Sequence, residues 1–143
     1  MNKNKMEIKA YTFLIKEEMI LYGFSKATIV KRQIPQNGTG YIHYIYLNLP
    51  ENANINITLR TVDLNNHEDV YQIYQNKQLS LRVLFYRTVE NGILYYDLES
   101  CGIKISNKST IFIDINNNDA YLHNVKINFF GYEILNKQTE LNN

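Results

Sequence analysis

Three histidines and one acidic segment are the first places to look for metal chemistry in this chain. His43 falls in an apolar run, His67 in the polar segment 63–69, and His123 just before the last apolar run. No two histidines stand two or four residues apart, so a metal site would have to be assembled from three distant segments. The carboxylates around His67 are typical of a solvated loop. We therefore predict no metal ligands.

The single cysteine offers little for catalysis. Because Cys101 is the only one, the sequence excludes an intramolecular disulfide and a cysteine-based zinc site. A nucleophilic thiol needs a base and electropositive surroundings, whereas Glu99 and Ser100 precede Cys101. Gly38 and Gly40 are too few for a phosphate-binding loop, and no Gly-x-Ser-x-Gly elbow is present. The sequence therefore predicts no catalytic residues, no cofactor and no enzyme activity.

Tyrosine is the residue type that offers a binding surface. The chain contains 12 tyrosines and no tryptophan. A tyrosine presents an apolar ring and a polar hydroxyl, which suits half-exposed contacts with a partner and stacking on a sugar ring. A second interpretation is that tyrosine only replaces other aromatic residues on half-exposed strands. The candidate interface residues are Tyr41, Tyr44, Tyr46, Tyr95 and Tyr96.

The charge balance and the hydropathy pattern argue against two classes of partner. The chain has 15 Lys and Arg against 14 Asp and Glu, a net charge of +1. Binding to a phosphate backbone needs a clustered positive field, so we expect no nucleic-acid partner. No apolar run reaches the roughly 18–20 residues of a membrane span, and residues 1–5 lead into no signal-peptide core.

The composition predicts an all-β chain. Of 143 residues, 20 are asparagine and 18 are isoleucine. Isoleucine and tyrosine favour strands, whereas asparagine favours turns. An AT-rich genome would produce the same bias, but the physical consequence is unchanged, because strand formers separated by turn formers are typical of a β-protein.

Alternating patterns locate the strands. Ile55–Val62 alternates as a half-buried strand does, and Tyr41–Leu49 is apolar on both faces, which predicts a central strand covered on two sides. Leu79–Val89 and Ile93–Leu98 are predicted to pair through a type I′ turn at Asn91-Gly92. Other strands are predicted at Ala27–Ile34, Val70–Tyr74, Thr110–Ile115 and Tyr121–Leu135, the last with a bulge or kink at Gly131, and a loop is predicted at Gln36–Gly40. The predicted core consists of Ile55, Ile57, Leu59, Leu81, Val83, Ile111, Ile113, Val125 and Ile127.

The N-terminal segment has a mixed pattern. Between Met6 and Tyr22 the apolar residues fit both helical spacing and strand alternation, and we favour the extended interpretation. We predict one β-sandwich domain over residues 1–143, in which residues 1–22 form an arm or an extra strand. An arm of this kind would be ordered mainly by a neighbouring chain.

The number and spacing of the strands predict the architecture. About eight strands follow one another without a βαβ rhythm, so a parallel sheet is disfavoured. The fold class that fits is an antiparallel two-sheet sandwich of the jelly-roll type, which uses eight strands. An eight-stranded up-and-down barrel is the rival.

The last third of the chain carries a resemblance to a known group of proteins. The segments 102–105, 109–115 and 125–134 read GIKI, STIFIDI and VKINFFGYEI, with an Asn-rich turn between the last two. This pattern resembles the closing strands of small jelly-roll virion structural proteins of bacteriophages. The resemblance implies a structural, non-enzymatic subunit that works as an oligomer.

Two functions of different classes follow. The first is a structural subunit of a virus or phage particle, such as a minor capsid, penton, decoration or fibre-base protein. Its partners would be other copies of itself and other virion subunits, and its location the virion or, alternatively, the cytoplasm. The second is a ligand-binding β-sandwich such as a carbohydrate-binding module, in which tyrosine stacks on sugar.

Overall fold

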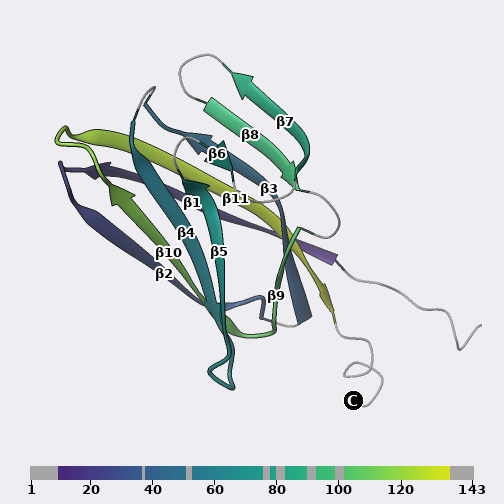
Figure 1. The fold of residues 1–143 in the computed structure, drawn as a ribbon. Coiled ribbons are helices and arrows are strands. Elements are labelled where there is room, and N and C mark those ends of the chain that lie inside the picture. Colours follow the sequence, from purple (N-terminus) through teal and green to yellow (C-terminus); the bar gives the residue numbers. More distant parts are fainter. Residues whose placement is uncertain are drawn as a thin grey trace, which may run out of the picture.

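The computed structural model consists of β-strands arranged in two sheets (Figure 1). The structure describes residues 10–36, 38–50, 53–75, 78–79, 83–89, 93–98 and 102–135. Every pairing between neighbouring strands is antiparallel. The protein is thus an all-β sandwich, as the composition predicts.

Sheet A contains six strands in the order β1–β11–β3–β8–β7, with β9 also paired to β3. The strands are β1 (Ala10–Leu21), β3 (Gly38–Asn48), β7 (Val83–Val89), β8 (Ile93–Leu98), β9 (Ile103–Ile105) and β11 (His123–Leu135). Strand β3 is central, because β11 lies along one edge and β8 and β9 share the other. Strand β1 forms one edge of this sheet.

Sheet B contains five strands in the order β2–β10–β4–β5–β6. The strands are β2 (Lys26–Ile34), β4 (Ile55–Val62), β5 (Glu68–Gln75), β6 (Gln78–Leu79) and β10 (Ser109–Asn117). Both β4 and β10 alternate regularly between buried and half-buried side chains, which is the expected pattern of a strand with one face on a core.

The strand order is that of a jelly roll. Four early strands pair with four later ones in reverse chain order: β1 with β11, β2 with β10, β3 with β8, and β4 with β5. The first four strands also fall alternately in sheet A and sheet B. This nested pairing is the jelly-roll arrangement. It contradicts the rival up-and-down barrel, in which each strand pairs with the next.

The core between the sheets is built mainly from isoleucine. Its fully buried members include Ile42, Ile45, Ile57, Leu59, Ile73, Ile105, Ile111, Ile113, Val125, Ile127 and Phe129. β-branched side chains suit this position because they lose little rotamer freedom in a strand. Seven of the nine predicted core residues are buried here; Leu81 lies outside the described residues, as does the side chain of Val83.

The interpretation of the N-terminal segment as an arm ordered by a neighbour is wrong for residues 10–21. Strand β1 pairs with β11 along its whole length, from Ala10 opposite Ile134 to Leu21 opposite His123. Its inward residues Ile15 and Leu21 are buried in the core. Residues 10–21 are thus the extra strand that was predicted as the alternative to an arm, and residues 1–9 lie outside the described residues.

The predicted strand Leu79–Val89 also needs correction. Gln78–Leu79 pairs with β5 in sheet B, whereas Val83–Val89 pairs with β8 in sheet A, so they are not one strand. The alternation of apolar residues in the sequence continues across both segments, so it does not reveal that they belong to different sheets. The pairing of β7 with β8 confirms the predicted hairpin, while the turn at Asn91-Gly92 lies outside the described residues.

The glycines before Tyr41 belong to a strand and not to a loop. Strand β3 begins at Gly38, and both Gly38 and Gly40 are buried. A Cβ atom on Gly40 would lie 3.0 Å from the ring of Pro35. Glycine therefore allows a close approach at this position where the sequence suggested a turn.

Candidate functional site: an aromatic surface on sheet A

The outer face of β3 carries the tyrosines that the sequence singled out. Ile42 and Ile45 are fully buried in the core. Tyr41 and Tyr46 are half-buried on the opposite face, and Tyr44 is 37% exposed. The prediction that β3 is central is confirmed. Among the described residues no element lies over its outer face, where Tyr44 is partly exposed, so the predicted cover on that side is not found in this part of the chain.

A β-bulge at His43 arranges the rings. Ile42 lies opposite Gly131 and Tyr44 lies opposite Phe130, so His43 is an extra residue of β3 against β11. An extra residue of this kind redirects side chains, and here both His43 and Tyr44 leave the buried side of the strand. Their rings stack with centroids 4.8 Å apart and planes inclined by 18°.

Strand β11 contributes the rest of the cluster. Tyr132 lies opposite Tyr41 in the register, and the ring centroids are 5.5 Å apart. The rings of Tyr132 and His43 are 6.4 Å apart. These separations lie in the range of favourable aromatic contacts. We call Tyr41, His43, Tyr44, Phe130 and Tyr132 the aromatic surface.

Gly131 lies between Phe130 and Tyr132 of the aromatic surface, and the space that a side chain would take there is already occupied. A Cβ atom at this position would lie 2.5 Å from the backbone oxygen of Tyr41 and closer still to the ring of Phe13. Gly131 therefore allows Phe13 of β1 to pack against the backbone of β11, because no other residue fits there. The predicted irregularity at Gly131 is present, with the extra residue on the partner strand β3.

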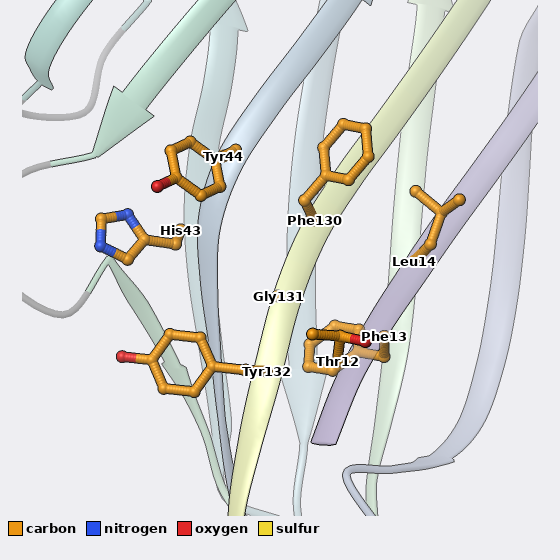
Figure 2. Close-up of a pocket in the computed structure, with 8 residues that line it drawn as sticks. All are labelled: Thr12, Phe13, Leu14, His43, Tyr44, Phe130, Gly131 and Tyr132. Atoms are coloured by element: carbon orange, nitrogen blue, oxygen red, sulfur yellow. The ribbon is translucent and has the colours of Figure 1, made fainter. Parts of the chain in front are cut away.

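A pocket of about 430 Å³ lies beside Gly131 on this face (Figure 2). It is lined by Thr12, Phe13, Leu14, His43, Tyr44, Phe130, Gly131 and Tyr132. In Figure 2 the imidazole of His43 and the hydroxyls of Tyr44 and Tyr132 lie on one side, and Leu14 lies on the opposite side. The volume is within the range of small-molecule sites. The pocket can therefore accept an apolar side chain or a flat ring with polar groups on one edge.

The structure places two of the five tyrosines that were predicted as an interface, Tyr41 and Tyr44, in the aromatic surface, and Tyr46 lies half-buried further along the same strand. Tyr95 and Tyr96 of β8 lie opposite Tyr46 and Ile45 in the backbone register, but their side chains are outside the described residues. His43, Phe130 and Tyr132 were missed. The alternation of β11 could have identified the last two, because Phe129 points inward and its neighbour Phe130 must then point outward.

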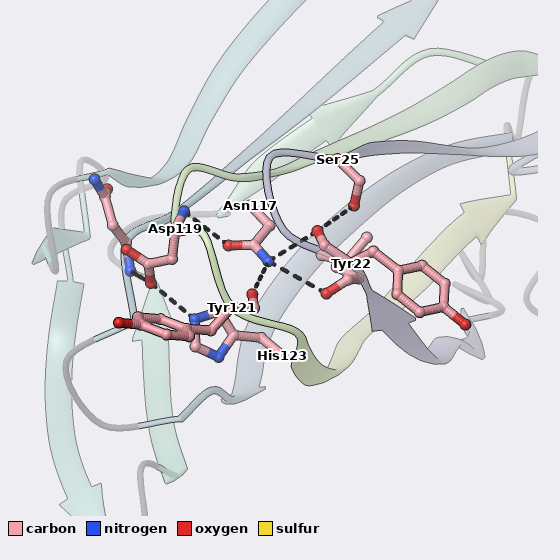
Figure 3. A network of polar contacts seen from close by, with 8 residues as sticks. Tyr22, Ser25, Asn117, Asp119, Tyr121 and His123 are labelled. Atoms are coloured by element: carbon pink, nitrogen blue, oxygen red, sulfur yellow. Dashed lines mark hydrogen bonds and ion pairs between the residues drawn. The ribbon is translucent and has the colours of Figure 1, made fainter.

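The nearest arrangement to a catalytic dyad lies at one end of the sandwich (Figure 3). His123 Nε2 is 2.7 Å from the Asp119 carboxylate, and the same carboxylate accepts a hydrogen bond from the backbone N–H of Asn54. The side-chain nitrogen of Asn117 donates to the carbonyls of Leu21, Tyr22 and Tyr121. These bonds join the β1–β2 turn to the β10–β11 turn, so the network holds two turns together.

The acidic segment around His67 forms a turn. The Asp63 carboxylate accepts hydrogen bonds from the backbone N–H groups of Asn65 and His67, an arrangement typical of an Asx turn. His67 lies 3.3 Å from the Asp69 carboxylate at the surface. Among the residues that the structure describes, no group of three or more His, Cys, Asp or Glu side chains is placed to hold a metal ion. The described ranges also contain no helix long and apolar enough to cross a membrane.

The outer face of sheet B carries a polar network that spans β2, β10 and β4. Arg60 Nε donates to the Asp114 carboxylate at 2.6 Å, and the Thr28 hydroxyl donates to the same carboxylate. The guanidinium also lies 4.6 Å from the ring centroid of Phe112. The hydrogen bond from Arg60 is the main cause that lowers the pKa of Asp114, and the hydrogen bond with Asp114 is the main cause that raises the pKa of Arg60.

No family model, curated protein or solved structure matches this chain. The geometry of the molecule is therefore the basis on which a function can be argued.

Proposed function

We propose that this protein is a non-enzymatic structural subunit of a virus or phage particle that acts through contacts with other copies and other subunits. The observation that carries the proposal is the aromatic surface. Rings from two adjacent strands form one apolar area around a pocket, on a sheet face that no described element covers. Aromatic residues are enriched at protein interfaces, where burial of large rigid rings stabilises association.

The fold supports the same proposal. Jelly rolls are used by viral capsid proteins, although they also occur in lectin domains and cupins, so the topology alone favours no single function. The pocket at Gly131 would receive an apolar side chain of a neighbouring subunit. Repeated copies in a symmetric particle would multiply contacts that are individually weak.

The proposal is tested by measuring mass in solution with matched variants. Phe130→Ser removes a ring from the aromatic surface, and Phe112→Ser removes a ring from the outer face of sheet B. In sedimentation experiments we expect the wild type and Phe112→Ser to associate, and Phe130→Ser to associate more weakly. Equal association of the two variants would contradict a role for the aromatic surface.

A second function is favoured by the pocket itself. Its stacked and tilted rings, with hydroxyls along one side, also suit a sugar ring, which presents an apolar face and polar edges. Titration with soluble mono- and oligosaccharides, followed by the NMR shifts of the His43 ring, tests this alternative. Saturable shifts in a chain that stays monomeric at every concentration would favour sugar binding over assembly.

A further inference from the structure

The outer edge of β1 is the feature from which a specific partner can be inferred, because no described strand pairs with it on that side. Strand β1 is long, running from Ala10 to Leu21, and pairs with β11 without a register shift. It contains neither proline nor glycine. Edge strands are usually protected from pairing with other chains by prolines, bulges or charged side chains. Strand β1 has no proline and no bulge, and its charged residues Lys16, Glu17 and Glu18 are the protection that it does carry. Its backbone donors and acceptors are therefore open to a partner strand whose charges complement these three residues.

The outward side chains of β1 are arranged symmetrically about Glu17. In chain order they are Thr12, Leu14, Lys16, Glu18 and Ile20. All five are exposed, and the two aliphatic residues strongly so, with Leu14 at 52% and Ile20 at 57%. The row therefore has one aliphatic residue on each side of a central pair of opposite charges.

This row complements itself in one register only. When two copies of β1 run antiparallel about a two-fold axis through Glu17, Lys16 of each copy faces Glu18 of the other, and Leu14 faces Ile20. A shift of the axis to residue 16 places Lys16 against Lys16. A shift to residue 18 places Glu18 against Glu18. Opposite charges and apolar pairs across strands stabilise a sheet, whereas like charges destabilise it.

We infer that two copies of this chain associate through β1, with residues 13–21 of each strand paired about Glu17 to form one continuous sheet across the dimer. The inference rests on the proposed function, because it names the contact by which the subunit begins to assemble. A two-fold contact of this kind uses the same surface on both subunits. It leaves the aromatic surface of both copies on the same side of the joined sheet.

The one unfavourable pair in this register is already compensated within each subunit. Glu17 would face Glu17 of the second copy at the two-fold axis. In each chain, however, the Glu17 carboxylate lies 2.7 Å from Lys31 Nζ of β2. This ion pair joins the edges of the two sheets and supplies a positive charge beside each glutamate.

Charge reversal with mixing tests the register. Lys16→Glu alone and Glu18→Lys alone each put two like-charged pairs into the dimer, whereas a mixture of the two variants restores two opposite pairs. By sedimentation of the full chain, we expect each variant alone to dimerise at least about tenfold more weakly than the wild type. The equimolar mixture should recover wild-type affinity as a heterodimer. Lys104→Glu on β9 is the matched control and should dimerise normally.

The possible results separate this inference from the proposed function. Recovery of the dimer on mixing supports pairing through β1, including when a variant melts at a lower temperature, because a loss of folding is not repaired by a second variant of the same strand. If the wild type associates and both variants associate equally well alone, pairing through β1 is wrong while assembly through the aromatic surface stands. If the wild type is monomeric, pairing through β1 is overturned. The proposed function then depends on whether the chain binds other subunits of the particle.

Discussion

The two outer faces of the sandwich rest on the same isoleucine core but differ in chemistry. On sheet B, Arg60, Asp114 and Thr28 bond to one another across three strands, and Arg60 also covers Phe112. The outer face of sheet A carries aromatic rings and a pocket, next to the bulge in β3. Polar groups that already bond to one another gain little from a partner. Rings that are partly exposed, as Tyr44 is, gain stability when a partner removes them from water.

The difference also shows how one alternating pattern serves two purposes. In β4 and β10 every second residue is buried, and β3 keeps the same alternation on both sides of its bulge. The inward residues of the two sheets are therefore of the same chemical kind. The outward-facing residues determine whether a sheet face stays in water or contacts a partner. Changes on the inward side should therefore affect folding, and changes on the outward side of sheet A should affect association.

The largest expected effect lies in the core that both faces share. Ile113 of β10 is 0% exposed. Ile113→Ala should lower the free energy of unfolding by about 2–5 kcal/mol, through lost burial and a residual cavity. Urea denaturation measures the change. A loss below about 1 kcal/mol would mean that Ile113 is not packed as described.

The next effect is specific to sheet A. Gly131→Ala places a methyl group against the Phe13 ring and the Tyr41 carbonyl. The strands must then shift, at a cost of about 1–3 kcal/mol in the free energy of unfolding, and the pocket should close. Thermal unfolding measures the cost, and a change in the NMR shifts of the His43 and Tyr132 rings would report the rearrangement. A neutral substitution would contradict the close approach of Phe13.

A smaller effect is expected on the outer face of sheet B. Arg60→Met removes the guanidinium from the Asp114 carboxylate and from the Phe112 ring. The free energy of unfolding should fall by about 1 kcal/mol, because both contacts are partly exposed. Association should be unchanged, as sedimentation can show. A loss of association would contradict the contrast between the two faces.

The smallest effect is a dependence of stability on pH. The pKa of Asp114 lies below its ordinary value of 3.8, chiefly because Arg60 donates a hydrogen bond to the carboxylate. The unfolded chain therefore binds the proton more readily than the folded chain. The stabilisation is complete above the ordinary pKa and is lost as the pH falls below it towards the native pKa. Asp114→Asn should flatten this part of the curve of unfolding free energy against pH, and an unchanged curve would contradict the assignment.

Much of the fold could be predicted from local pattern. The strict alternation of Ile111, Ile113 and Ile115 places three side chains on one face whatever the rest of the chain does. The hairpin of β7 and β8 follows from two apolar runs separated by a turn signal. The N-terminal strand was harder, because its apolar residues fit two periods and only pairing with β11 distinguishes them.

The candidate site could be predicted only in part. Tyr41, Tyr44 and Tyr46 stand in one apolar run, so their grouping is visible in the sequence. Phe130 and Tyr132 are more than 80 positions further along the chain, and no local rule says which strand β11 adjoins. The bulge at His43 could not be predicted from the sequence either, because a bulge depends on the register between two paired strands.

The amino-acid sequence by itself determined which side chains face inward in the regularly alternating strands β4 and β10, since alternation is a property of a single strand. It supplied Leu14, Lys16, Glu18 and Ile20, but pairing with β11 decided that they form one row on a strand. Only the tertiary structure decided that Gly131 meets Phe13 and that Tyr132 meets Tyr41 and His43. Such contacts depend on register and strand order, which are fixed by the burial of the whole core together and not by any one segment.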